Sequence, residues 1–577
     1  MKLKLFIIFW LVLLLSPAKA WVSVGSSPGF GTCTYATIQQ AIDSNEAEIR
    51  ILNNQDFFEN IEIDHSVDIK GGYNSCLAAS LNQEGNSNSV IKGSAILGAP
   101  VVEINSINSP TIRFYDLTLR DATDTAFITN GGHAIDIGNS NGLIEVIDSL
   151  IISNNAEDGG GIYIGSAIGI DPLNLIITDS SIFGNTASIR GGGLYCSRSN
   201  AVVRISGNSL ISENSAEDGG GIAASNGCGV TVDSGSDLTA DLRGIVANEA
   251  TQFGGGVFLN SEASLTLQGN KYGFGILGNN TDPVTIANNT ANSKGGGIYA
   301  INGAEIEITD GYITNNLSST GHGGGIYLGE STTTPVTLTM QSSSLPCWNP
   351  GKCSILSNNK SDANGGGLYL QGAAQSTILN TYIFGNRANF GTAVYVSAIN
   401  GLGTAAYIEG SYFYENGNNA ANSYADNFVI RGNGDIDIDL VHITMADNDI
   451  NDTRSVIGSL NSNLTIKNSL LDNYPETILE QSGSSANILC TVASDLSSLD
   501  FYVFPTSFVD SGNHDYHLAS DSQARDACAM TTTILNIDTD NQPRGWDDYT
   551  AGNYDGTYDA GADESYSNDI IFKHGFE

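Results

Sequence analysis

Short runs of alternating apolar and polar residues fill most of this chain, and they recur about every thirty residues. One copy, residues 191–218, reads GGGLYCS, AVVRISG, NSLISEN and SAED. Its three alternating or β-branched runs are separated by Gly, Ser and Asn, which is typical of strands and turns. No run has the length or the periodicity of a helix. The pattern predicts one three-sided coil per repeat.

Two motifs mark the repeats. Eleven times an apolar residue is followed three positions later by asparagine, and a three-glycine run comes soon after seven of these pairs. A fixed period of this size indicates stacked supersecondary units. The pairs are Ile152/Asn155, Ile182/Asn185, Ile211/Asn214, Ile245/Asn248, Ile286/Asn289, Ile313/Asn316, Leu356/Asn359, Ile383/Asn386, Phe413/Asn416, Met445/Asn448 and Leu470/Asn473. The glycine runs begin at Gly159, Gly191, Gly219, Gly254, Gly295, Gly323 and Gly365, with a degenerate run at Gly391.

We therefore predict an all-β fold, a single-stranded right-handed parallel β-helix with three strands in each of about a dozen coils. Glycine suits the bends because it accepts positive φ, and stacked asparagines can bond through their side-chain amides. One coil buries too little apolar surface to hold together alone, so its neighbours must stabilise it and both ends need caps.

The chain divides into four predicted parts. Residues 1–20 have the pattern of a secretory signal, with two early lysines, an apolar run and Ala18-Lys19-Ala20 as the cleavage site. Residues 21–90 form the N-terminal cap and first strands, with a short amphipathic helix at 37–42 and strands at 49–52, 61–63 and 67–69. The β-helix covers 91–480, and 481–577 form a C-terminal module and tail.

Acidity restricts the partners. Removing residues 1–20 takes away three lysines and no acids, so the formal charge goes from −39 to −42. Such a surface repels nucleic acids and anionic polysaccharides, while neutral glycans and cations remain acceptable partners. The mature chain has no apolar stretch as long as a membrane helix, and the sequence leaves its oligomeric state open.

Eight cysteines in an exported chain point to disulfides. The sequence predicts a loop staple between Cys347 and Cys353 and a tie at each end of the rod, from Cys33 with Cys76 and from Cys490 with Cys528. Cys196 and Cys228 lie on consecutive coils, but their offsets from the glycine run differ by four residues, so their pairing stays open. No CxxC motif or histidine pair at ligand spacing predicts a metal site.

An aromatic residue recurs two positions after most glycine runs. Period-two alternation places these rings on the face opposite their aliphatic neighbours, outside the coil. A column of such rings could stack on sugars and bind a glycan, or it could be a ladder that stabilises the rod. The candidate ligand-binding residues are Tyr163, Tyr195, Phe258, Tyr299, Tyr327 and Tyr369, with Ala223 as an exception and Tyr395 after the degenerate run.

Three carboxylates form the best candidate for acid chemistry. Asp435, Asp437 and Asp439 alternate along one strand, so they share one face, which suits Ca²⁺ or a solvated surface. If the protein is an enzyme, these residues and His442 are the candidate catalytic group. Asp538 and Asp540 open like a calcium loop, but Gln542 and Pro543 replace the next ligand and the glycine, so we predict no metal there. We predict no cofactor. Ca²⁺ is the one ion that these carboxylates would suit.

These repeats resemble the passenger repeats of chlamydial polymorphic outer-membrane proteins and bacterial right-handed parallel β-helix repeat proteins. The tail, in HDYHL (514–518), ARDA (524–527), DTDNQPR (538–544) and DAGADE (559–564), is similar to the choice-of-anchor Q module that closes many exported β-helix proteins. It departs from that pattern at Cys528 and Asp563. The resemblance implies presentation outside the cell, or at its surface, in a Gram-negative bacterium.

Two functions fit the sequence. The first is a non-enzymatic secreted or surface scaffold, adhesin-like or glycan-binding, whose partner is an extracellular glycan or a host or cell-surface component. The second is a polysaccharide lyase or glycoside hydrolase with its site on a groove of the β-helix. Lyases of this fold pair calcium-binding carboxylates with a lysine or arginine base, and the coils carry no such base beside an acidic cluster. We therefore favour the scaffold.

Overall fold

The structure is a computed structural model of the chain. It describes residues 21–26, 32–94, 98–106, 108–123, 131–138, 140–165, 172–233, 243–271, 281–329, 334–343, 354–399, 402–418, 428–449, 455–472, 474, 476–480, 483–493, 502–503, 506–529, 533–545 and 556–565.

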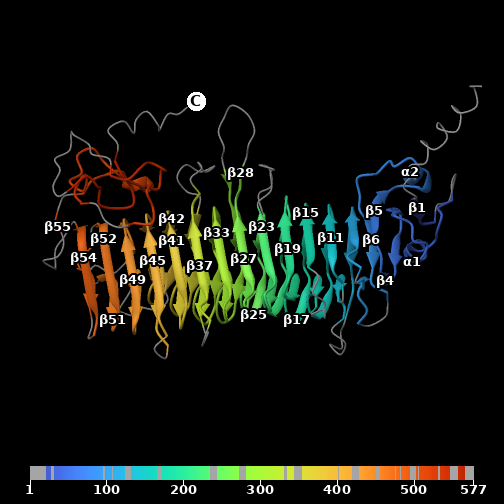
Figure 1. The fold of residues 1–577 in the computed structure, drawn as a ribbon, viewed down its shortest axis with the longest axis horizontal. Helices are drawn as coiled ribbons and strands as arrows, with labels where there is room; N and C mark the ends of the chain where they lie inside the picture. The colour runs from blue at the N-terminus through green and yellow to red at the C-terminus, as the bar shows by residue number, and fades with distance from the viewer. Residues whose placement is uncertain are drawn as a thin grey trace, which may run out of the picture.

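Parallel strands wind into one long rod, with the N-terminal elements at one end and the C-terminal module beside the other (Figure 1). In the described residues the rod has three sheets, of 30, 14 and 9 strands, which we call sheets 1, 2 and 3. A middle coil runs from a sheet 2 strand through a long and then a short strand of sheet 1 to a sheet 3 strand, and a glycine run returns it to sheet 2. The predicted parallel β-helix is confirmed.

Sheet 1 contains two rows of strands, a long row and a short row. The long row consists of β1 (Trp21–Val24), β2 (Glu48–Leu52), β5 (Val67–Tyr73), β8 (Thr111–Tyr115), β11 (Gly142–Ile147), β15 (Leu173–Thr178), β19 (Ala201–Ser206), β23 (Gly229–Asp233), β27 (Ser264–Gln268), β33 (Glu305–Thr309), β37 (Thr337–Gln341), β41 (Gln375–Leu379), β45 (Thr404–Glu409), β49 (Ile436–Val441), β52 (Asn463–Leu471) and β54 (Ser485–Ala493). The short row consists of β3 (Asp56–Phe58), β6 (Ser89–Lys92), β9 (Leu117–Arg120), β12 (Leu150–Ile152), β16 (Ser181–Phe183), β20 (Leu210–Ser212), β24 (Gly244–Val246), β30 (Val284–Ala287), β34 (Gly311–Thr314), β38 (Ser354–Ser357), β42 (Thr381–Phe384), β46 (Tyr412–Tyr414) and β50 (Thr444–Met445), and β55 (Tyr502–Val503) pairs with β54.

Sheets 2 and 3 complete the coil. Sheet 2 consists of β4 (Ile61–Ile63), β7 (Val102–Ile104), β10 (Ile135–Ile137), β14 (Ile162–Ile164), β18 (Leu194–Ser197), β22 (Ile222–Ser225), β26 (Val257–Leu259), β32 (Ile298–Ile301), β36 (Ile326–Gly329), β40 (Leu368–Gln371), β44 (Val394–Ser397), β48 (Ile430–Asn433), β51 (Ser455–Leu460) and β53 (Glu476–Glu480). Sheet 3 consists of β13 (Asn155–Asp158), β17 (Thr186–Arg190), β21 (Ser215–Asp218), β25 (Glu249–Phe253), β31 (Thr290–Ala291), β35 (Leu317–Ser318), β39 (Lys360–Ser361), β43 (Arg387–Ala388) and β47 (Gly417–Asn418). The SAED segment at 215–218, which the sequence pattern did not count among its strands, is therefore a fourth short strand.

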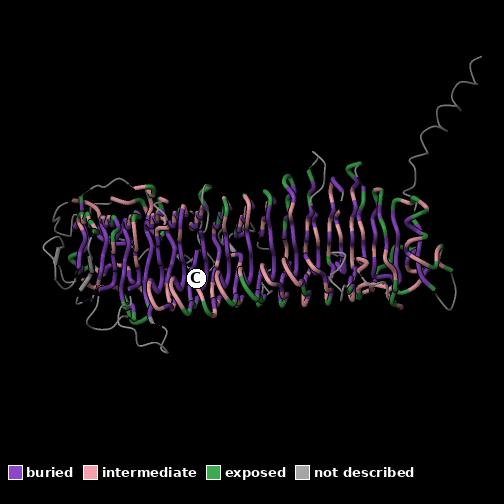
Figure 2. Tube along the Cα trace, turned by 90° about the horizontal axis from the view of Figure 1, so that it is seen from below, coloured by how far each residue is buried: buried purple, intermediate pink, exposed green. Residues whose placement is uncertain are grey.

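Inward-facing aliphatic residues build one continuous core. It runs along the rod from Val22 to Ala493, and Figure 2 shows buried residues along the whole length. Because successive residues of a strand face opposite sides, Ile162 and Ile164 enter the core while Tyr163 points away from it. The parallel ladders extend from Trp21 to Val503, beyond the predicted bounds of 91 and 480 at both ends.

A buried column of asparagines fixes the coils against each other. In each step the backbone N–H and the Nδ2 of one asparagine both donate to Oδ1 of the next, as from Asn185 to Asn214 at 3.0 Å and 3.0 Å. The Nδ2 also donates to a carbonyl of the preceding coil, as from Asn185 to Ile151 at 3.0 Å. The column consists of Asn154, Asn185, Asn214, Asn248, Asn289, Asn316, Asn359, Asn386, Asn416 and Asn448.

Two predicted members of this column are wrong by one residue. Ile151, not Ile152, pairs with Ile182, so Asn154 enters the column and Asn155 starts β13 instead. At the other end Leu471 pairs with Met445, and the hydroxyl of Tyr474 accepts from Nδ2 of Asn448 at 2.7 Å, ending the column. Asn473 lies outside the described residues.

The glycine runs allow the coils to approach closely. The first glycine of a run has positive φ, +65° at Gly191, where a side chain would be strained. The second and third face the backbone of the next coil. A Cβ on Gly192 would lie 2.4 Å from the carbonyl oxygen of Ser215 and 2.5 Å from that of Gly220, so no larger residue fits without a shift.

The first coil is covered by the predicted helix. α1 (Ile38–Ile42) begins after Thr37, whose Oγ1 accepts from the N–H of Gln40 at 3.3 Å, and Ile38, Ala41 and Ile42 pack into the core. The expected strands at 49–52, 61–63 and 67–69 lie within β2, β4 and β5. A second helix, α2 (Cys76–Ser80), is tied to the cap by the disulfide Cys33–Cys76.

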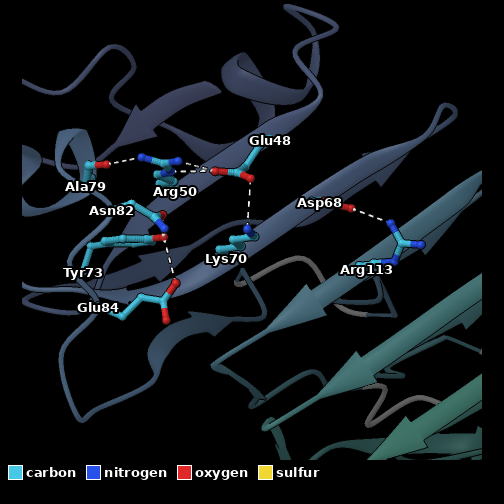
Figure 3. Close-up of polar contacts among 9 residues, drawn as sticks. All are labelled: Glu48, Arg50, Asp68, Lys70, Tyr73, Ala79, Asn82, Glu84 and Arg113. Atoms are coloured by element: carbon cyan, nitrogen blue, oxygen red, sulfur yellow. Dashed lines mark hydrogen bonds and ion pairs between the residues drawn. The ribbon is translucent and has the colours of Figure 1, made fainter. Parts of the chain in front are cut away.

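Charged side chains cover the outer face of these first strands (Figure 3). Glu48 accepts from Nε of Arg50 at 2.6 Å and pairs with Nζ of Lys70 at 3.0 Å. Burial by itself would raise the pKa of Glu48, but these two partners outweigh it and hold the pKa below its ordinary value. The carboxylate of Glu48 therefore stays ionised in the folded N-terminal cap.

Two more disulfides join described cysteines. Cys196–Cys228 links consecutive coils, and Cys490–Cys528 ties β54 to the C-terminal module. The four-residue difference in offset is accommodated because Cys196 lies in β18, whereas Cys228 lies after β22, just before β23. Cys347 and Cys353 lie outside the described residues.

Candidate functional site

The aromatic residues after the glycine runs form a stacked column on the outer face of sheet 2. Ring centroids of successive stacked members lie 5.0–5.6 Å apart, the tilted pair Tyr163 and Tyr195 lies 5.8 Å apart, and Ala223 leaves one gap. The rings point away from the core, as the alternation predicts, yet they are buried. The exposed fraction runs from 0% at Tyr327 to 8% at Tyr395, and Tyr163 is half-buried.

The residue that precedes a glycine run covers this column. The Arg190 guanidinium lies 4.5 Å from the ring centroid of Tyr195, Phe253 stacks on Tyr299 at 4.7 Å, and His322 stacks on Tyr369 at 4.5 Å. The faces of these rings are therefore already in contact with each other or with the residues that cover them. This geometry favours the stabilising ladder, and sugar stacking on these residues stays a prediction.

Asp437 and Asp439 lie on the outer face of β49, and Asp435 comes directly before this strand. On β49, Asp437 is exposed and Asp439 half-buried, while Ile436 and Ile438 enter the core, as the alternation predicts. Asp437 accepts from Nδ2 of Asn463 on the next coil at 3.0 Å. Among the described residues that could gather around a metal ion, these acids form no group. Their role in Ca²⁺ binding or catalysis stays a prediction.

His442 lies apart from the exposed acids. It is fully buried, with its ring 6.0 Å from the ring of Tyr558 in the C-terminal module. Burial, and then the positive charge of Arg544, hold its pKa well below the ordinary value, so the imidazole is neutral. The exposed Asp437 and the buried His442 do not form one surface.

Long insertions occupy one corner of the coil. At the corner between the long and the short row of sheet 1, most coils have one to three residues, such as Asp179 and Ser180 between β15 and β16. In the coil of β5 and β6 the same connection is residues 74–88, which contain α2, and in three later coils it is residues 234–243, 269–283 and 342–353. The second of these later insertions starts and ends in an antiparallel pair, β28 (Asn270–Lys271) with β29 (Thr281–Asp282), seen at the edge of the rod in Figure 1.

The C-terminal module packs on the outside of the last coils (Figure 1). It contains β56 (Phe508–Asp510), the 3₁₀ helix η1 (Ser511–Asn513) and β57 (Asp515–Leu518). Tyr516 packs among the outward rings of the short row, with Tyr412 and Tyr414. The carboxylate of Glu409, fully buried on β45, accepts from the N–H groups of Ile534 and Leu535 at 2.9 Å and 3.0 Å.

Polar residues of the tail form hydrogen bonds with one another. Asp538 accepts from the N–H groups of Asp540 and Gln542 at 2.9 Å and 2.8 Å, and Asp559 accepts from that of Asp526 at 2.7 Å. These carboxyls are buried. Burial raises the pKa of Asp538 and of Asp559 to about 7.

A histidine and two aspartates of the module were missed as a group. The ligand atoms of His517, Asp540 and Asp563 all lie within 4.8 Å of one another. Burial by itself would lower the pKa of His517, but Asp563, Asp515 and Asp540 raise it to about 12. The three residues come from separate segments, so their spacing along the chain does not indicate a common site. The Asp538–Asp540 motif was the one indication in the sequence, and it did not predict a metal site.

Comparison with known proteins points to the repeats. The Chlamydia polymorphic membrane protein repeat matches residues 283–301, which include Ile286, Asn289 and the run from Gly295. The probable outer membrane protein pmp20 of Chlamydia pneumoniae is 28% identical over 190 residues. The match covers 31% of this chain and 10% of that relative, so the chain spans only a small part of it. The segment matched by the repeat, 283–301, contains Asn289 and Gly296, which contact the neighbouring coils.

The helices of the described residues are short. None of them is long and apolar enough to cross a membrane.

Proposed function

We propose that this protein is a non-enzymatic, adhesin-like scaffold, presented outside the cell or on the surface of a Gram-negative bacterium. The secretory pattern of residues 1–20 and the similarity to an outer membrane protein of Chlamydia support this location. The repeated residues stabilise the rod, because the asparagines, glycines and aromatic rings all make contacts between coils.

The observation that carries the proposal is the shared corner of the three insertions. In repeat proteins, insertions map to loops on one face, which is often the binding face. Residues 234–243, 269–283 and 342–353 each connect a strand of the long row to a strand of the short row of sheet 1. We assign contact with an extracellular glycan or a cell-surface component to these insertions. The buried aromatic column then supports them as a stiff frame.

Replacement of the insertions tests this assignment. Each of the three would be replaced by Asp-Ser, the pair that forms the short corner at Asp179 and Ser180. The third replacement removes Cys347 and Cys353 together, so no unpaired thiol is left. On a glycan array and on intact cells, we expect the mature chain to bind and the shortened chain to lose at least about 10-fold in affinity, which corresponds to about 1.4 kcal/mol.

The matched control alters the corner that follows sheet 2. Glu262→Ser with Asn302→Ser changes two exposed residues there and should leave binding unchanged. Both variants should keep the circular dichroism of the parent. Equal binding by the shortened chain would contradict the role of the insertions.

A parallel assay decides between scaffold and enzyme. The mature chain would be incubated with polyuronates and with neutral polysaccharides, with and without Ca²⁺. The scaffold predicts no unsaturated product and no new reducing ends. Product that disappears in Asp437→Ala would overturn the scaffold and place a lyase or hydrolase on the face of β49. Protease treatment of intact cells tests the location, since an external rod is cleaved without lysis.

A further inference from the structure

Three segments of the C-terminal module converge on one point. His517 lies on β57, Asp540 follows the turn at Asp538, and Asp563 lies in the last described segment. Nε2 of His517 is 3.0 Å from Oδ2 of Asp540, and the ligand atoms of all three residues lie within 4.8 Å of one another. Two ligands about 2.1 Å from one tetrahedral Zn²⁺ are roughly 3.4 Å apart, close to the first of these distances.

Asp563 brings a buried carboxylate oxygen without a partner. Its side chain is buried, with a residue exposure of 3%, and its Oδ2 accepts no hydrogen bond from any described residue. A buried carboxylate that is neither paired nor hydrogen-bonded is costly, unless a cation or a proton neutralises it. Asp563 therefore needs either a bound cation or a proton in this cluster.

The imidazole of His517 is oriented by a second carboxylate. Its Nδ1 forms a hydrogen bond with Oδ1 of Asp515, so Nε2 is the nitrogen that faces Asp540. Histidines that bind metals commonly donate their other ring N–H to a carboxylate, which fixes the ring and the free nitrogen. Asp515 occupies that position here.

The surroundings contain further buried carboxyl groups. Glu564 and Asp538 are fully buried beside the cluster, and Oε2 of Glu564 also lacks a described partner. The nearby Arg544 donates from Nη2 to the carbonyl oxygen of Ala562 at 2.7 Å. A second positive charge at the convergence point would stabilise all these carboxylates together.

We propose that His517, Asp540 and Asp563 bind one divalent transition cation of the class of Zn²⁺ or Mn²⁺. An imidazole nitrogen with two carboxylates suits these ions better than Ca²⁺, which prefers oxygen ligands alone. Asp515 is the positioning residue.

The site would fasten the module to the rod. The segment of Asp563 already contacts the last coils, because the N–H of Ala562 donates to Oγ1 of Thr444 at 2.9 Å and that of Gly561 to the carbonyl of Asn468 at 2.9 Å. His517 and Asp540 belong to other segments of the module. A cation shared by all three would join these two segments to the segment that contacts the rod, and this role is independent of what the scaffold binds.

The competing arrangement has no metal. A doubly protonated His517 lies between Asp515, Asp540 and Asp563 and neutralises them by itself. The two arrangements differ in whether the native protein retains a stoichiometric ion.

Metal analysis and titration separate them. The full mature protein would be purified without chelator and examined by plasma mass spectrometry, then stripped with a chelator and titrated by calorimetry with ZnCl₂, MnCl₂ and CaCl₂. We expect one Zn²⁺ or Mn²⁺ per chain and weaker binding of Ca²⁺. Asp563→Asn and His517→Gln should abolish the binding, and Asp515→Asn should weaken it about 10–100-fold.

A control and a second readout keep the test decisive. Asp521→Asn removes an exposed carboxylate from the same module and should bind the ion as the parent does. Proteolysis of the module should be faster in the stripped protein and should slow again when the ion is returned. Absence of a stoichiometric ion, Ca²⁺ as the tightest binder, or unchanged binding in Asp563→Asn would overturn the proposal.

Discussion

The rod and the C-terminal module solve the same problem, the burial of polar groups, in different ways. In the rod each buried asparagine meets an identical neighbour, so one contact repeats from Asn154 to Asn448. In the module each buried carboxylate has its own set of partners, and Asp563 and Glu564 keep an oxygen without one. The rod therefore repeats one contact along its length. The module uses a different contact for each buried carboxylate, so its stability depends on the charges of these groups.

Breaking the asparagine column should have the largest effect. Asn289→Ala removes the acceptor of the N–H and Nδ2 of Asn248, at 2.9 Å and 3.0 Å, and leaves both donors buried. We expect the free energy of unfolding of the surrounding coils to fall by about 3–5 kcal/mol, measured by urea denaturation. Asn174→Ala, at an exposed position of β15, should change it by less than about 0.5 kcal/mol. Equal effects would refute the column's role.

A methyl group added in a glycine run should lower the free energy of unfolding by somewhat less. A Cβ on Gly324 would lie 2.4 Å from the carbonyl oxygen of Lys360 on the next coil, so Gly324→Ala must push the two coils apart. We expect a loss of about 3 kcal/mol, seen as a lower midpoint in urea. Gly403 has no atom within 4 Å of its Cβ position, and Gly403→Ala should be close to neutral. A neutral Gly324→Ala would show that close stacking is not required.

Loosening the module should spare the rod. Glu409→Ala removes the carboxylate that accepts from Ile534 and Leu535, and we expect a loss of about 2 kcal/mol confined to the docking of the module. Limited proteolysis should release fragments from the module first, while the rod stays resistant. The exposed Glu307→Ala on β33 serves as the control and should not alter the cleavage pattern. Simultaneous loss of both regions would mean that they unfold as one unit.

The smallest effect concerns a half-buried acid of the rod. Burial, and then the neighbouring Glu217, raise the pKa of Asp218 to about 6. Because the folded state holds this proton more tightly than the unfolded chain, the contribution to stability is present below about pH 4 and is lost as the pH rises to about 6. Asp218→Asn should therefore stabilise the protein by about 1 kcal/mol at pH 7 and have no effect at pH 3. Thermal melts at both values check this. A pH-independent effect would contradict it, and Glu305→Gln is the exposed control.

Periodicity explains why most of the rod could be predicted. Ile182 and Asn185 recur at equivalent places because each coil must present the same side chains to the next. The first member was predicted one residue late, because Asn154 and Asn155 are adjacent and both follow an isoleucine at the required spacing. Strand register and burial place Asn154 in the column, and the sequence alone does not show either of them.

The aromatic column and the module show where sequence reasoning stops. Alternation placed Tyr327 outside the core correctly, but its burial comes from neighbouring rings and from Lys294, which lies 4.9 Å from its ring centroid. The cluster at His517 assembles residues from distant segments, so no spacing rule could find it. The segments that resemble the choice-of-anchor Q module contain these residues, with Asp563 as a departure from its pattern, but the resemblance did not predict their contacts.

Hydrogen exchange along the asparagine column tests the central claim most directly. The N–H groups of Asn185, Asn214, Asn248, Asn289 and Asn316 each donate to the next asparagine side chain. We predict slow exchange of all these amides in the parent, and faster exchange of the Asn248 amide in Asn289→Ala. Rapid exchange of these amides in the parent would contradict stacked coils held in register by a buried column.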